Sequence, residues 1–135
     1  MNKLSIEASI NNLDAVIDFI NSELDSYECP IKTRTRLDIA VEEIFVNIAH
    51  YAYSGETGMA EIIIDIKSDP TAAVITFIDS GVPYDPLAKE DPDVTLSLEQ
   101  RKIGGLGIFM VKKSMDDMIY EYKDGKNHLT IVKNL

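Results

Sequence analysis

Hydrophobic and polar residues alternate along this chain with two different periods, and the changes of period predict its elements. Leu4, Ile6 and Ala8 alternate with polar residues, as in a half-buried strand. Apolar residues at three- and four-residue spacings predict a helix over residues 13–24, and a longer helix over residues 33–53. The amino-terminal part of the chain is therefore expected to be one strand followed by two helices.

The remaining pattern predicts two hairpins separated by one short helix. Apolar residues alternate over 62–66 and again over 72–78, on either side of a polar turn, as in an antiparallel hairpin. A short helix is expected over residues 107–115, with Phe109, Met110 and Val111 turned inward. The runs 118–122 and 129–132 then flank Asp124-Gly125, which predicts a second hairpin.

This order of elements predicts an α+β fold, a two-layer sandwich with a mostly antiparallel sheet and helices on one face. With 135 residues the chain fits a single domain over residues 1–135. The connection over residues 83–102 is longer than most loops and contains Pro83, Pro86 and Pro92. We expect it to form a lid or to carry a short helix.

Composition narrows the functional classes. The formal net charge is -10, so the surface field repels phosphodiester backbones and anionic lipid, and neither nucleic acid nor a membrane is expected as a partner. A nucleotide remains compatible with this charge, because Mg²⁺ and backbone N–H groups act locally. A single cysteine, Cys29, allows no internal disulfide, and no apolar segment is long enough for export or membrane spanning, which favours a cytoplasmic protein.

The predicted long helix carries the first candidate pair, Glu43 and Asn47. Four residues apart, they project from one side of a helix. A carboxylate activates a hydroxyl or water as a general base, and a carboxamide oxygen is a ligand for Mg²⁺. A solvated polar helix face is the alternative interpretation of the same spacing.

Asp79, Ser80 and Gly81 end the predicted strand over residues 72–78. A carboxylate at the end of a buried strand accepts a hydrogen bond from an amino group such as that of adenine, and Gly81 permits close approach of the chain. An ordinary Asx turn is the alternative.

The segment Gly104-Gly105-Leu106-Gly107 precedes the predicted short helix. Such a loop points backbone N–H groups at an anion, and the helix dipole adds to the attraction. A tight loop without a ligand is the alternative. No Gly-Lys-Ser/Thr follows, so the segment is not a Walker loop, and no strand leads directly into it as in the dinucleotide fingerprint.

Taken in order, Glu43-x-x-x-Asn47, Asp79-x-Gly81 and Gly104-Gly-x-Gly107 resemble the N, G1 and G2 boxes of the GHKL (histidine kinase-like) ATPase superfamily. Over its whole length the chain is similar to the small anti-sigma factor serine/threonine kinases of that superfamily. The resemblance implies a Bergerat-type ATP-binding fold, ATP and Mg²⁺ as ligands, and a sigma factor and an anti-sigma antagonist protein as partners. It also implies a homodimer.

The same resemblance implies a role for each matching residue. Glu43 would be the catalytic base that activates a protein serine hydroxyl, and Asn47 would hold Mg²⁺. Asp79 would bind the adenine amino group, with Gly81 lining the base. The phosphates would lie against Gly104, Gly105, Leu106 and Gly107 under a lid near residues 85–103, with Arg101 as a lid cation.

Two positions depart from the pattern of the superfamily. Pro83 replaces a second glycine of the G1 box and removes one N–H group. Tyr51 replaces a histidine that commonly follows the metal-binding asparagine, and His50 lies one place early. The resulting hypothesis is an ATP-dependent serine/threonine kinase. A nucleotide-gated binding module without turnover, and an interaction domain that binds no nucleotide, are the alternatives.

Overall fold

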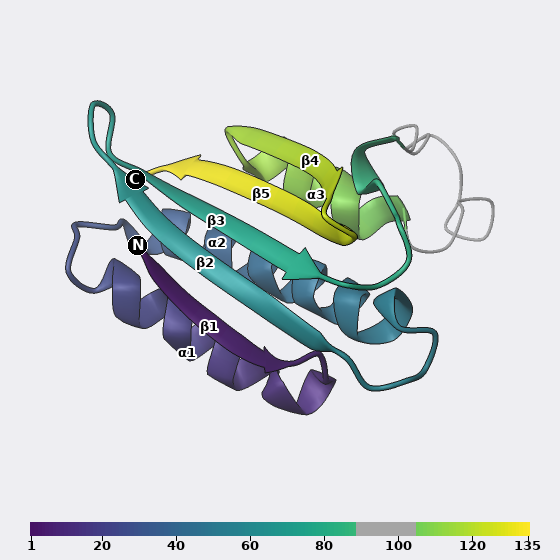
Figure 1. Cartoon of the computed structure of the whole chain (residues 1–135). Helices are drawn as coiled ribbons and strands as arrows, with labels where there is room; N and C mark the ends of the chain where they lie inside the picture. Colours follow the sequence, from purple (N-terminus) through teal and green to yellow (C-terminus); the bar gives the residue numbers. More distant parts are fainter. Residues whose placement is uncertain (89–104) are drawn as a thin grey trace.

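The computed structural model describes residues 1–88 and 105–135 (Figure 1). Their main elements, in chain order, are β1 (Asn2–Glu7), α1 (Leu13–Leu24), α2 (Ile31–Asn47), β2 (Met59–Lys67), β3 (Ala72–Asp79), α3 (Gly105–Ser114), β4 (Asp117–Lys123) and β5 (Lys126–Asn134). A π-helix over Ile48–Ala52 continues α2, and short 3₁₀ helices span Ile10–Asn12 and Pro86–Ala88. The last of these opens the long predicted connection, most of which lies outside the described residues.

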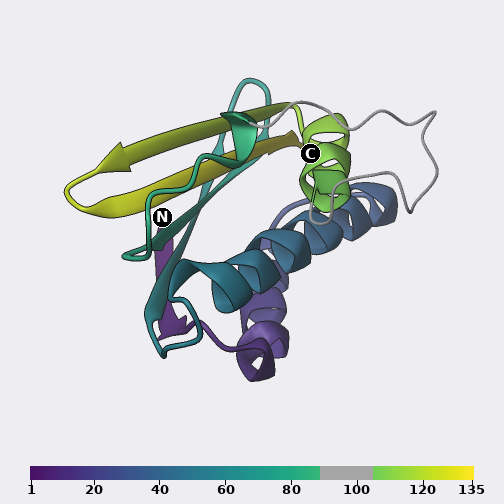
Figure 2. The same ribbon diagram turned by 90° about the vertical axis from the view of Figure 1, so that its right-hand side faces the viewer.

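The strands form one antiparallel sheet in the order β1-β2-β3-β5-β4. Both predicted hairpins are present, and β5 lies between β3 and β4, so that the carboxyl-terminal hairpin adds to the sheet through its second strand. The helices lie together on one face of this sheet (Figure 2). The predicted two-layer α+β sandwich is therefore confirmed.

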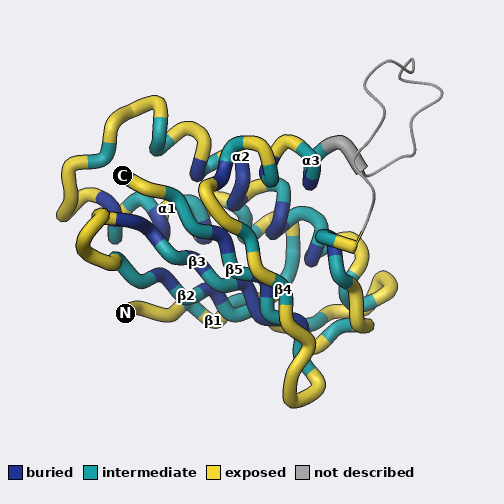
Figure 3. The backbone as a smooth tube through the Cα atoms, turned by 90° about the horizontal axis from the view of Figure 1, so that it is seen from above, coloured by how far each residue is buried: buried dark blue, intermediate teal, exposed yellow. Residues whose placement is uncertain are grey.

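The core lies between the sheet and the helices, and Figure 3 shows buried segments on both layers. Side chains alternate between the two faces of a strand, so every second residue of the central strands faces the helical layer. Along β3 the inward positions end with a polar residue, because Asp79 follows Phe77 on the same face. The inward side chains of the three central strands are buried: Ala60, Ile62, Ile64, Ala73, Ile75, Phe77, Leu129 and Ile131.

Helix α2 lies between α1 and α3 and supplies the predicted apolar stripe to this core. Leu37, Val41, Ile44 and Ile48 are all buried. The helix begins two residues before the predicted Thr33, directly after Pro30, a residue tolerated at helix starts because it lacks an N–H group. At its other end the change to a π-helix was not predicted, because apolar spacing does not distinguish a wider turn from an α-turn.

Helix α3 corrects one prediction about its inward face. Val111 is buried as expected, but Met110 is 55% exposed and Ile108 is buried instead. Consecutive residues are about 100° apart around a helix, so three in a row cannot all face the core. Ile108, Val111 and Met115 share the buried face at three- and four-residue spacings.

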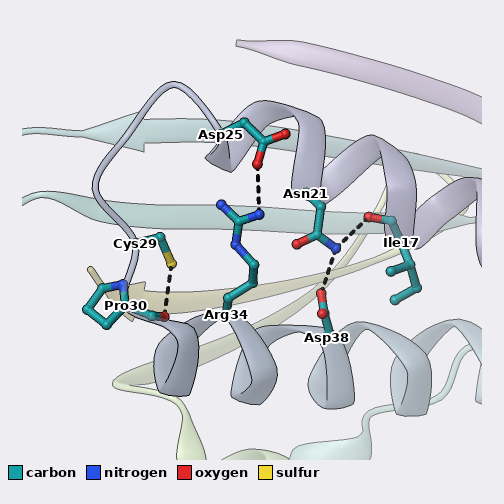
Figure 4. A network of polar contacts seen from close by, with 7 residues as sticks. All are labelled: Ile17, Asn21, Asp25, Cys29, Pro30, Arg34 and Asp38. Atoms are coloured by element: carbon teal, nitrogen blue, oxygen red, sulfur yellow. Dashed lines mark hydrogen bonds and ion pairs between the residues drawn. The ribbon is translucent and has the colours of Figure 1, made fainter.

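Polar contacts also join α1 to α2 (Figure 4). The Asn21 Nδ2 group on α1 donates to the carbonyl oxygen of Ile17 at 3.0 Å and to Asp38 Oδ1 on α2 at 2.9 Å. Arg34 Nη1 donates to Asp25 Oδ1 at 2.7 Å near the connection between the two helices. These contacts fix where α2 lies against α1, and thereby where its carboxyl-terminal end meets the sheet.

At that end, the chain leaving β3 packs closely on the π-helix. A Cβ atom at Gly81 would lie 2.2 Å from the carbonyl oxygen and 2.7 Å from the Cβ atom of Ala52. The next residue, Val82, donates its N–H to the same carbonyl oxygen at 3.1 Å. Only glycine allows this approach, because any side chain would push the two backbones apart.

We expect Gly81→Ala to lower the free energy of unfolding by about 1–3 kcal/mol, because the added methyl group overpacks against backbone atoms that cannot move independently. Urea unfolding followed by circular dichroism measures this change. Ser80→Ala is the matched control: Ser80 is an exposed neighbour whose only hydrogen bond in the described structure uses its backbone N–H group. Equal stability of the two variants would contradict the close approach.

Candidate functional site

A cavity of about 470 Å³ opens between the end of α2, the π-helix and the adjacent ends of β3, β5 and β4. Its volume is in the range of small-molecule sites. Most of the wall is apolar or aromatic, with Asn47, Asp79 and Asn127 as the polar groups other than tyrosine hydroxyls. The lining residues are Ile44, Asn47, Ile48, Tyr51, Ala52, Phe77, Asp79, Val82, Pro83, Tyr84, Pro86, Ile108, Tyr120, Asn127 and Leu129.

Asp79 is the last residue of β3 and is only 7% exposed. Its Oδ1 atom accepts hydrogen bonds from the N–H of Gly81 at 2.9 Å and from Asn127 Nδ2 at 3.0 Å. The first bond makes an Asx turn, which was the alternative interpretation of this segment. Both hydrogen bonds end on the same oxygen, so within the described structure the second oxygen, Oδ2, is left as an acceptor in a residue that lines the cavity.

Asn127 is a site residue that the sequence analysis missed. It is the direct cross-strand partner of Asp79 in the β3–β5 pairing, and it is 6% exposed. The available signal was its place two residues after Asp124-Gly125 and two before Leu129, which puts it on the inward face of the predicted strand. The sequence pattern did not show which residue it would face.

Both ends of the Asn127 carboxamide are occupied. Its Nδ2 group donates to Asp79 and, at 2.9 Å, to the carbonyl oxygen of Val82. Its Oδ1 atom accepts from the N–H of Tyr84 at 3.1 Å and from the hydroxyl group of Tyr120. One side chain thus joins β3, β4 and the segment after β3.

Tyr120 closes this network from β4. Burial raises the pKa of its phenol, and the neighbouring carboxylates of Asp85 and Asp79 act in the same direction. The hydroxyl group therefore stays protonated at neutral pH and keeps donating to Asn127. The protonated phenol holds the carboxamide oxygen of Asn127. The amide nitrogen of the same side chain is then directed at Asp79 and Val82.

Residues 81–84 are held at both ends despite the proline among them. Pro83 lines the cavity and offers no N–H group, as predicted. The residues on either side of it compensate, because the N–H of Val82 binds the π-helix and the N–H of Tyr84 binds Asn127. The segment is therefore anchored although Pro83 lacks the N–H group that the glycine of the superfamily pattern has at this position.

The candidates on α2 occupy neighbouring places. Asn47 lines the cavity, whereas the half-buried Glu43 does not. The Glu43 carboxylate lies against Gly107, where an added Cβ atom would be 2.2 Å from Oε2. Their sequence neighbours Ile44 and Ile108 line the cavity, whereas Glu43 and Gly107 do not.

Of the predicted site residues, Glu43 therefore contacts Gly107. Asn47 and Asp79 line the same cavity. Gly81 contacts the π-helix and is not part of the wall. Gly105 and Leu106 belong to the first turn of α3, and Arg101 and Gly104 lie outside the described residues.

Tyr51, which departs from the family pattern, and its neighbour His50 have different surroundings near the end of α2. Tyr51 lines the cavity, and its neighbour His50 is exposed and meets the Tyr51 ring edge-on at a centroid distance of 5.8 Å. Tyr51, rather than His50, is thus the side chain that a bound molecule would meet.

This arrangement suits a flat, largely apolar group that carries an amino group. Apolar walls favour the body of such a group, and a buried carboxylate with a free oxygen accepts from its N–H. The nearby carboxamide of Asn47 offers an oxygen to a hard cation.

Among the described residues, none of the helices has the length and apolar character of a membrane-spanning segment.

Comparisons with known proteins identify the family of the chain. The family model of the histidine kinase-like ATPase domain matches residues 6–133. The serine/threonine-protein kinase BtrW of Bordetella bronchiseptica is 26% identical over 103 residues, which cover 76% of this chain and 72% of that protein. The serine-protein kinase RsbW of Listeria monocytogenes is 30% identical over 93 residues, or 66% of this chain and 59% of that protein.

A solved structure shows the same fold. The crystal structure of the RsbU and RsbW domains of Rv1364c from Mycobacterium tuberculosis superposes with a TM-score of 0.66 at 14% sequence identity, covering 100% of this chain and 33% of the other. Together with the family match over almost the whole sequence, this establishes that the chain belongs to the family of histidine kinase-like ATPase domains.

Proposed function

We propose that this protein binds ATP in the cavity, with the adenine ring between the apolar walls and its 6-amino group on Asp79. One observation carries the proposal: the Asp79 carboxylate is buried, and both of its hydrogen bonds end on one oxygen. Oδ2 belongs to a residue that lines the cavity and accepts no hydrogen bond from the described residues, so an N–H group of a ligand can donate to it there.

The phosphates would extend from this point along α2 toward α3. Asn47 would hold Mg²⁺, which would supply positive charge to offset that of the phosphates. A single carboxamide ligand suits this ion, because Mg²⁺ keeps waters and phosphate oxygens in most of its coordination sites. The first turn of α3, with Gly105, Leu106 and Gly107, would offer N–H groups to the phosphates. Gly104 and Arg101, which lie outside the described residues, would add a further N–H group and a cation.

We further propose that the protein is a serine/threonine kinase and an anti-sigma regulatory factor. Its relatives in Bordetella and Listeria are named serine/threonine-protein kinase and serine-protein kinase, and Glu43 lies one helical turn from the cavity-lining Asn47 on the same helix. In this proposal Glu43 accepts the proton of a serine hydroxyl group as that oxygen attacks the γ-phosphate. The acceptor would be a small anti-sigma antagonist protein, and a sigma factor would bind a cytoplasmic homodimer of the chain.

The second candidate is a binding module in which ATP controls partner capture without turnover. The position of Glu43 favours it, because the carboxylate does not line the cavity and lies against Gly107. Both candidates require Asp79 and Asn47. They differ in whether Glu43 takes part in chemistry.

For Glu43→Ala we expect unchanged ATP affinity and a loss of phosphoryl transfer by a factor of about 10²–10⁴, the usual contribution of a general base. Calorimetry with ATP measures binding, and transfer of label from γ-labelled ATP to the antagonist protein measures turnover. Glu42→Ala, an exposed neighbour on the same helix, is the control. Transfer at the rate of the unmodified protein by Glu43→Ala would exclude Glu43 as the base, and absence of transfer in the unmodified protein would favour the binding module.

Asn47→Ala tests the proposed metal ligand. We expect it to weaken ATP binding by about tenfold or more in Mg²⁺ buffer, since an interaction with a charged group is worth about 1.5–3 kcal/mol. Binding of ATP in the presence of a chelator should not change. Titration calorimetry in both buffers checks this, and an equal loss in both would place the metal on other residues.

A further inference from the structure

The carboxamide of Asn127 uses its full hydrogen-bonding capacity inside the molecule. Two N–H donors and two acceptor sites are available to an asparagine side chain. The donors meet Asp79 Oδ1 and the carbonyl oxygen of Val82, and the acceptor sites meet the Tyr84 N–H and the Tyr120 hydroxyl group. Nothing remains with which Asn127 could bind a ligand strongly, so its effect on the site is exerted through its neighbours.

The contact with Asp79 determines which carboxylate oxygen stays available. Rotation about the last side-chain bond of an aspartate exchanges its two oxygens. Asn127 Nδ2 and the Gly81 N–H both bind Oδ1, from a neighbouring strand and from the turn respectively. Two donors from different directions on one oxygen hold the carboxylate plane, and Oδ2 is then presented in a defined direction.

The other contacts hold the adjoining wall. Val82, Pro83 and Tyr84 line the cavity. Asn127 binds the backbone on both sides of Pro83, at the Val82 carbonyl oxygen and at the Tyr84 N–H. The same side chain therefore sets the direction of the carboxylate and the position of the wall beside it.

We propose that Asn127 is the positioning residue that gives the cavity its selectivity for a purine with a 6-amino group. It acts by holding Asp79 and residues 82–84 in the binding geometry before the ligand arrives. This inference rests on the proposed function, because it takes adenine as the group that Asp79 contacts.

The test compares ATP with purine riboside triphosphate, which has the same ring and phosphates but no 6-amino group. We expect the unmodified protein to bind ATP about tenfold to hundredfold more tightly than purine riboside triphosphate. This difference in dissociation constant corresponds to the free energy of one hydrogen bond to a charged group. Asn127→Leu keeps the same branched arrangement of side-chain heavy atoms and has no hydrogen-bonding groups. We expect it to reduce the ratio of the two dissociation constants to about threefold or less, because Asp79 then keeps only the Gly81 N–H contact and one donor holds the carboxylate plane less firmly than two.

A second variant keeps the fold with a smaller change. Tyr120→Phe retains the ring and removes only the hydroxyl group that binds Asn127 Oδ1. We expect its ratio to fall between those of the unmodified protein and Asn127→Leu. Thr130→Val is the matched control, since Thr130 is on the same strand, points to the opposite face and bonds the Thr76 hydroxyl group at 2.9 Å. Thr130→Val should keep the ratio of the two dissociation constants at the value of the unmodified protein. Circular dichroism establishes that each variant is folded.

The readout separates positioning from a general structural role. If Asn127→Leu and Tyr120→Phe weaken both nucleotides by the same factor, so that the ratio stays at its original value, the inference is overturned and the proposed ATP site stands. If the unmodified protein binds neither nucleotide, the proposed function itself fails, and the inference fails with it. A reduced ratio in both variants supports the inference.

Discussion

The buried charge of Asp79 is the constraint on which the organisation of this site depends. An ionised carboxylate inside a protein costs several kcal/mol unless hydrogen bonds replace the lost water. Here the replacement comes from two directions, from the turn that follows β3 and from Asn127 on β5. Asn127 lies 48 residues from Asp79 in sequence, so this second hydrogen bond forms only when β5 pairs with β3.

The helical layer completes the site through a change in helix geometry. Where α2 becomes a π-helix, the carbonyl oxygen of Ala52 receives the Val82 N–H, and Gly81 packs on the same peptide group. π-Turns are often found at functional sites, where they redirect a helix wall. The end of β3 is thus fixed on one side by the π-helix and on the other by Asn127, and the cavity lies between these anchors.

Neither the net charge of the protein nor the cavity wall supplies positive charge for a polyphosphate. The chain carries a formal charge of -10, and no Lys or Arg is present among the described residues that line the cavity. Attraction for a polyphosphate would therefore depend on Mg²⁺ and on backbone N–H groups at the start of α3, rather than on the surface field. Family membership is consistent with this arrangement, whereas the kinase activity and the protein partners proposed above depend on groups outside the cavity.

The sequence by itself determined the strands, the helices and the two-layer class, because periods of 2 and 3.6 report directly which faces are buried. It also marked Asp79, whose Asx turn with Gly81 is made by residues two apart. The inward face of α3 also follows the helical period, through Ile108, Val111 and Met115. Tertiary structure decided the π-helix and the part played by Asn127. Sheet order and strand register place Asn127 opposite Asp79. Periodicity reports which face a residue occupies, and only the folded packing decides which residue from another strand it meets there.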